Sequence, residues 1–199
     1  MFKKILSIAV CAVFTGAMFC GCGDKEESSQ DFYYGQTLKE VDGKEIYLIY
    51  DGRFVEDEEM DALVNYYVSI QNKDYDLFRT VQPETYLEFL EDKQSMDIPG
   101  YVDDEYSQME TDLGAGFDFS QIEVTDCGDS KDDNGINDIK DLLDGIYKDA
   151  GKEKSFSDTI KSAKYITYDL TAAGGDGDDY NLTDETKYIF TCEDGIYIF

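Results

Sequence analysis

The first 22 residues most constrain what this chain can fold into, because they do not read as part of a soluble core. Lys3 and Lys4 open the segment, a nearly continuous apolar run covers 5–19, and polar sequence begins at Asp24. A basic start, an apolar middle and a small residue before a cleavage point are typical of an export signal. The apolar run of 15 residues is shorter than the roughly 20 that cross a bilayer as a helix.

The junction Phe19-Cys20-Gly21-Cys22 resembles the lipobox of bacterial lipoproteins. In that family, lipid is attached to a cysteine thiol and the signal is cut just before that residue. The resemblance implies that Cys22 is lipidated and that Gly21 is the last residue removed. Cys20 fits less well, because bulky Phe19 precedes it where a small side chain is expected. A plain secretory signal and a single spanning helix are the alternatives.

This interpretation divides the chain into three parts. Residues 1–21 are the signal peptide, 22–35 a lipid-anchored polar tether, and 36–199 one globular domain of ordinary size. An acyl chain contributes about 0.8 kcal/mol of membrane affinity per methylene, and two chains anchor stably. We therefore expect the domain to be held by lipid at the extracytoplasmic face of a bacterial cell membrane.

Composition excludes several classes of function. Removal of the signal leaves 15 basic against 45 acidic residues, a net charge near −30. Nucleic-acid binding needs a basic footprint, so we expect no nucleic-acid partner. The chain has no histidine, which removes Ser-His-Asp and Cys-His catalysis and the commonest transition-metal ligand. The acidity favours solubility over an acidic docking surface.

Two of the five cysteines, Cys127 and Cys192, belong to the folded part. An extracytoplasmic location permits a disulfide between them. Two buried free thiols are the alternative, and a metal site of four cysteines is impossible.

Hydrophobic periodicity predicts an α+β domain. Residues 57–72 form a helix with apolar side chains at i, i+3 and i+4 positions, and Asp42-Gly43 is a strong hairpin turn within 37–55. Because strands and helices do not alternate regularly, we expect a mostly antiparallel, curved sheet packed against several amphipathic helices. The other expected elements are helices or turns at 74–81, after Pro83, at 103–113 and 136–147, and strands at 117–125, 164–171, 187–192 and 195–199.

Asn65-Tyr66-Tyr67, the run 71–78 and the closing segment 194–199 together resemble small extracytoplasmic domains of the nuclear-transport-factor-like (SnoaL-like) superfamily. The resemblance implies a cone-shaped sheet with a pocket. Some members of that superfamily are enzymes and many only bind or scaffold, so no site residues are carried over.

Two acidic loops are candidate calcium sites. The loop 126–138 has oxygen ligands and a flexible glycine, as Ca²⁺ sites require. With Gly135 at the sixth EF-hand position, however, the first position falls on Ser130 and the twelfth on Asp141. The loop 174–179 matches one Gly-Gly-x-Gly-x-Asp calcium repeat, which needs a stacked second copy. For both we favour ordinary loops, the first with Asn137 or Asp138 capping the following helix.

The remaining candidates also favour structural roles. We expect Tyr33-Tyr34, Tyr66-Tyr67 and Tyr197 to be core aromatics rather than pocket walls, and Arg53 and Arg79 to form surface ion pairs. The leading hypothesis is a membrane-anchored, non-enzymatic binding or scaffolding lipoprotein with no cofactor and a protein or small-molecule partner. The alternatives are a lipoprotein that binds a small ligand or Ca²⁺ and, third, an enzyme that uses carboxylates and tyrosines.

Overall fold

The computed structural model of the chain describes residues 35–41, 44–129 and 133–199. The expected signal peptide 1–21, its junction at Gly21 and Cys22, and the tether up to residue 34 lie outside the described residues. The described residues all belong to one compact unit. Within the described part of the chain, no helix is both long and apolar enough to cross a bilayer.

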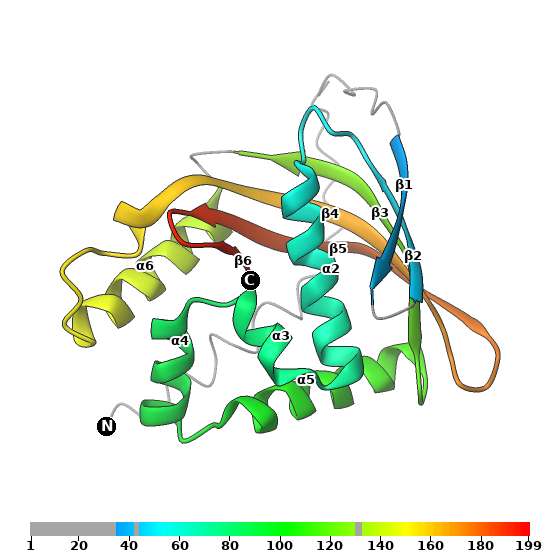
Figure 1. Cartoon of the computed structure of the whole chain (residues 1–199), viewed down its shortest axis with the longest axis horizontal. Coiled ribbons are helices and arrows are strands. Elements are labelled where there is room, and N and C mark those ends of the chain that lie inside the picture. The colour runs from blue at the N-terminus through cyan, green and yellow to red at the C-terminus, as the bar shows by residue number, and fades with distance from the viewer. Residues whose placement is uncertain (1–34, 42–43, 130–132) are drawn as a thin grey trace, which may run out of the picture. The chain divides into compact units, whose positions relative to one another are not determined.

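A six-stranded sheet is the centre of the domain, and its strands lie in the order of the sequence. All neighbouring pairs are antiparallel except β2 and β3, which are parallel. The sheet curls around helix α2 (Figure 1). The predicted α+β fold with a curved, mostly antiparallel sheet is therefore confirmed. The strands are β1 (Gly35–Val41), β2 (Lys44–Tyr50), β3 (Asp118–Gly128), β4 (Ile160–Ala173), β5 (Asp179–Cys192) and β6 (Ile196–Ile198).

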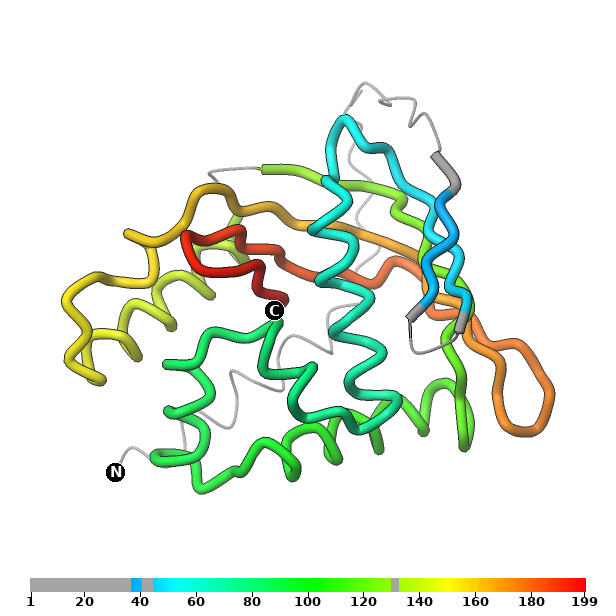
Figure 2. The backbone as a smooth tube through the Cα atoms, in the orientation of Figure 1, coloured from blue at the N-terminus to red at the C-terminus, as the bar shows by residue number. Residues whose placement is uncertain are grey.

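Most of the helical layer lies in one connection, the crossover from β2 to β3. It contains α2 (Asp57–Asn72), α3 (Tyr75–Thr80), α4 (Glu84–Phe89), the π-helix η1 (Leu90–Gln94) and α5 (Ile98–Leu113). The backbone trace shows this connection running along one side of the sheet (Figure 2). Between β3 and β4 come α6 (Asn134–Asp149) and the short 3₁₀ helix η2 (Ser157–Thr159).

The expected starts of α5, β4 and β5 were wrong by four residues or more. Helix α5 begins at Ile98 rather than at 103, because the Asp97 side chain accepts a hydrogen bond from Gly100 N and caps the first turn. Pro99 is tolerated there, since the first-turn N–H groups have no intrahelical partner. Strand β5 begins at Asp179 rather than at 187, and β4 begins at Ile160 rather than at 164, because residues 170–173 and 179–182 extend the antiparallel pairing of the two strands.

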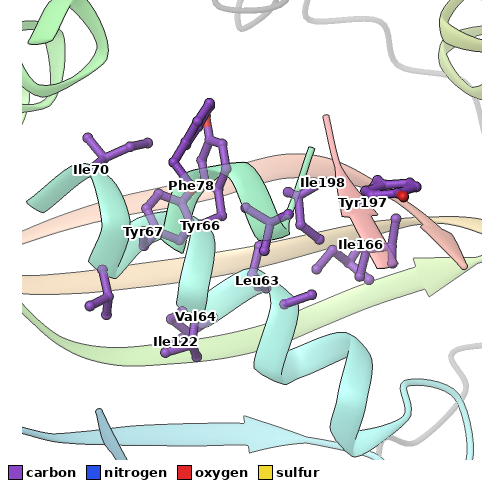
Figure 3. Packing of buried hydrophobic residues seen from close by; sticks show 14 of the residues in the cluster. Leu63, Val64, Tyr66, Tyr67, Ile70, Phe78, Ile122, Ile166, Tyr197 and Ile198 are labelled. Atoms are coloured by element: carbon purple, nitrogen blue, oxygen red, sulfur yellow. The ribbon is translucent and has the colours of Figure 1, made fainter. Parts of the chain in front are cut away.

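Helix α2 is buried around most of its circumference. Ten of its 16 residues are buried, more than the single face that its periodicity predicted. Leu63 points toward Ile198 and Val64 toward Ile122 of the sheet, whereas Tyr66 lies toward Phe78 of α3 (Figure 3). The helix is thus enclosed by the concave face of the sheet on one side and by α3 and α5 on the other.

Helix α6 covers the opposite face of the sheet at one end. Side chains alternate along β5, so Tyr188 and Phe190 point away from the face that carries Lys187 and Ile189. A Cβ at Gly135 would lie 2.0 Å from the Tyr188 hydroxyl, so a larger residue there would require the Tyr188 side chain or the first turn of α6 to shift. Phe156 closes the same layer, with its ring centre 5.5 Å from that of Phe190.

The first turn of α2 is joined to the sheet by a buried ion pair. Lys164 Nζ of β4 donates to Glu59 Oε2 at 2.7 Å and to Phe54 O at 2.8 Å. Thr191 of β5 donates to the other carboxylate oxygen at 3.3 Å, and Glu56 N donates to Oε2 at 2.9 Å. Glu59 is only 2 % exposed, so these partners replace water around its carboxylate.

Replacing Lys164 by Met should destabilise the domain strongly. It leaves the Glu59 carboxylate buried without its cation, and such a loss costs about 3–5 kcal/mol. Urea unfolding of the unaltered protein and of the variant measures the difference in the free energy of unfolding. The matched control is Lys152→Met, whose pair with Glu88 is 3.7 Å long and well exposed; it should cost at most about 1 kcal/mol. Equal losses in the two variants would contradict a special role for the buried pair.

Candidate functional site

Strand β5 places a lysine inside the curl of the sheet. Lys187 lies opposite Ile166 of β4 and is 6 % exposed. Its Nζ donates to the Tyr66 hydroxyl at 3.1 Å and lies 4.4 Å from the centre of that ring. A buried ammonium is costly without such partners, and the face of an aromatic ring attracts a cation.

Helix α5 contributes the acidic partner of this lysine. The Tyr66 hydroxyl, which accepts from Lys187, donates to Glu105 Oε2 at 3.4 Å. Tyr101, also on α5, hydrogen-bonds to the same carboxylate. Lys187, Tyr66, Glu105, Tyr101 and the neighbouring Glu185 are called the Lys187 cluster below. The cluster links β5, α2 and α5 through polar contacts.

Burial disfavours the charged forms of both main members of the cluster. It lowers the pKa of Lys187, against the opposing effect of Glu105 and Glu185. It also raises the pKa of Glu105, although Lys187 and hydrogen bonds from Tyr66 and Tyr101 act the other way. Lys187 and Glu105 each lose hydration on burial, and the charge of each partly offsets the effect of this loss on the other.

A lysine with a lowered pKa meets one requirement for covalent chemistry with carbonyl compounds. The second requirement is space for the carbonyl beside Nζ. Lys187 is almost fully enclosed, and the interior next to it is filled by rings: the Tyr67 and Tyr168 hydroxyls share a hydrogen bond, and the Tyr67 and Phe119 ring centres are 5.1 Å apart. The geometry thus favours a structural role for the Lys187 cluster.

Within the described residues, one hollow lies away from this cluster, between η1 and the start of α5. It is open to solvent and has a volume of about 560 Å³. Among its acidic residues, Glu91 pairs with Arg79 at 2.7 Å and Asp97 caps α5, so these two carboxylates already have protein partners. Its lining residues are Glu91, Gln94, Ser95, Met96, Asp97, Gly100 and Asp104.

The described residues of the two acidic loops do not come together. Gly128, at the end of β3, lies opposite Tyr165, whereas Asp118 lies opposite Ala173; the loops therefore begin at opposite ends of the β3–β4 pair, about 26 Å apart. Asp133, not Asn137 or Asp138, caps α6 by accepting from Ile136 N at 3.0 Å. Residues 130–132 lie outside the described part. In the rest, no group of three or more carboxylates or cysteines is arranged as a metal site.

The sequence left open whether Cys127 and Cys192 form a disulfide, and in the structure both are free thiols. Cys127 lies on β3 and Cys192 on β5, with β4 between them. Two strand spacings are about 9–10 Å, beyond the roughly 7 Å between Cα atoms that a bridge tolerates. The alternative was two buried free thiols; Cys192 is buried and Cys127 is partly buried. Burial raises the pKa of each thiol to about 11.

The described aromatic candidates lie in the core, and the two arginines form ion pairs. Tyr66, Tyr67 and Tyr197 are 3 %, 4 % and 7 % exposed, which confirms them as core residues; Tyr33-Tyr34 lie outside the described residues. Arg79 pairs with Glu84 and Glu91 at the surface, as predicted. Arg53 differs, because its partner Asp51, 2.9 Å from Nε, is buried.

No known protein family, curated protein or solved structure matches this chain. The lipobox resemblance at 19–22 and the superfamily resemblance at 65–78 therefore stay predictions from short motifs.

Replacing Lys187 by Met should raise the pKa of Glu105 further, because Lys187 is the largest influence that lowers it. A carboxyl whose folded pKa is raised stabilises the fold below its unfolded pKa, and this contribution is lost as pH rises through the folded pKa. In the variant the loss should therefore occur at higher pH. Carboxyl-carbon NMR titration measures the pKa directly. Lys161→Met, an exposed lysine on β4, is the control and should leave the titration unchanged; an unaltered Glu105 titration in Lys187→Met would refute the coupling.

Reductant should leave the melting temperature of the domain unchanged, because neither thiol is bridged. A bridge closing a loop of this length would contribute roughly 4 kcal/mol in the chain-entropy model. Calorimetry with and without reductant, after air oxidation, makes the comparison. A melting temperature that falls on reduction would show that a bridge forms after all.

Proposed function

We propose that this protein is a lipid-anchored, extracytoplasmic scaffolding or binding module rather than an enzyme. The observation that carries the proposal is the filled interior of the curled sheet. In a cone-shaped catalytic domain this interior holds the substrate; here Tyr66, Tyr67 and Tyr168 occupy it and are at most 4 % exposed. A ligand pocket usually needs a concave, largely enclosed space with a few convergent polar groups, and the open hollow beside η1 does not enclose a ligand.

The amino-terminal sequence supports the anchor. Its basic start, apolar run and Gly21-Cys22 junction match what lipid attachment at Cys22 requires, and the polar stretch that follows separates the lipid from β1. The high negative charge keeps the exterior soluble and discourages self-association. A domain that is held at a membrane and has a filled core acts through its surface, by binding another molecule there.

Replacing Cys22 by Ser should release the protein from membranes or leave the signal uncut, because the thiol is the proposed point of acylation. Membrane fractionation and the mass of the mature chain measure both effects. Cys20→Ser is the matched control and should be processed and retained normally. Unchanged retention and unchanged processing in Cys22→Ser would end the lipoprotein proposal.

Binding of a small molecule inside the curled sheet would contradict the proposal that this interior is filled. A small molecule that raises the melting temperature saturably, and that shifts NMR signals of Tyr66 and Tyr168, would show that the interior opens to ligands. The protein would then be a small-ligand binder.

A further inference from the structure

The outward face of the β1–β2 hairpin carries an uncovered apolar pair. Leu38 lies opposite Tyr47, so both side chains are on one face of the hairpin, and Ile49 follows two residues later on that face. Leu38 is 47 % and Tyr47 52 % exposed, whereas the inward-facing Ile46 and Leu48 are each 2 % exposed. Leu38, Tyr47 and Ile49 are called the hairpin patch.

The pairing of exposed apolar side chains distinguishes the hairpin patch from the remaining surface. Among the described residues, the exposed large apolar side chains are Leu38, Tyr47, Met96 and Leu142. Met96 and Leu142 lie singly, on the approach to α5 and on α6, as exposed apolar residues commonly do. The other two are paired across neighbouring strands.

We propose that the hairpin patch rests on the lipid surface to which Cys22 is joined, and so fixes how the domain is oriented above the membrane. The proposal depends on the anchoring proposed above. It assigns to the patch a lipid partner, recognised at the boundary between headgroups and acyl chains.

The length of chain between anchor and strand is the first reason. Twelve residues, 23–34, separate Cys22 from Gly35, where β1 begins. Even fully extended, they reach only about 40 Å, and Leu38 lies about 10 Å further along β1. A linker this short gives a local concentration in the millimolar range. A contact too weak to bind a membrane by itself would therefore be occupied in the anchored protein.

The chemistry of the patch is the second reason. Tyrosine has an apolar ring and a polar hydroxyl, and it is enriched at membrane interfaces for that reason. A second copy of the chain fits less well, since it would bring a similar charge near −30 against this one. Glu40 and Glu45 face each other on the same hairpin. The patch should therefore prefer zwitterionic over anionic lipid, and added salt should weaken that preference.

A single-tryptophan reporter tests the contact, because the chain has no tryptophan. Tyr47→Trp places the indole in the patch, and Leu142→Trp places it on α6 as the matched control. Each full-length, lipidated variant is reconstituted into phosphatidylcholine vesicles with or without brominated acyl chains. The Tyr47→Trp indole should emit at shorter wavelength on vesicles and be quenched by the bromines, whereas the Leu142→Trp indole should behave as it does in solution.

A second substitution separates insertion from mere proximity. Leu38→Glu in the Tyr47→Trp background should abolish the wavelength shift and the quenching, while circular dichroism stays unchanged because Leu38 is exposed. Equal quenching of the two reporters, or an unshifted Tyr47→Trp indole, would overturn the proposal. A shift that depends on protein density and shows no bromine quenching would assign the patch to a second copy instead, and would also overturn it.

Flotation of the vesicles in the same samples distinguishes a failure of the lipid contact from a failure of the anchor. Protein that floats while the patch reporter stays unquenched refutes the lipid contact alone. Protein that fails to float refutes the anchor, and the patch proposal with it.

Discussion

The enclosure of α2 is the constraint on which the rest of this structure depends. A helix covered by the sheet on one side and by α3 and α5 on the other buries polar groups together with apolar ones. Each buried polar group then needs a partner from a neighbouring element. Glu59 pairs with Lys164, and the Tyr66 and Tyr67 hydroxyls hydrogen-bond to Lys187 and Tyr168 respectively. The polar interior is thus the set of contacts that makes the enclosure of this helix possible.

The sequence predicted the elements well where a local signal was present. Residues 57–72 were assigned as a helix with the bounds that the structure has, because the apolar spacing and the acidic first turn both act within that segment. The start of α5 was predicted at 103, whereas the helix begins at Ile98 and includes Pro99 and Gly100, two poor helix formers. The Asp97 cap that overrides this signal is a single side-chain contact.

The polar interior was not predicted, because the alternation of side chains along β5 predicts the wrong face for Lys187. The more apolar set along β5 includes Tyr188 and Phe190, so alternation alone would turn these residues toward the main core and Lys187 toward solvent. Both faces are covered at this end of the sheet, since α6 packs on one and α2 on the other. Which face receives the lysine is decided by partners distant in sequence, namely Tyr66 and Glu105.

The parallel pairing of β2 with β3 has a consequence for how the domain assembles. It closes a loop over residues 51–117, which contains four α-helices, whereas β4, β5 and β6 are joined by short turns. Closing this long loop costs chain entropy before the contacts between β2 and β3 can stabilise the fold. The β1–β2 hairpin is therefore expected to join the sheet late during folding and to detach early during unfolding. The strands nearest the proposed anchor are thus the ones through which pulling on the lipid end would first open the domain.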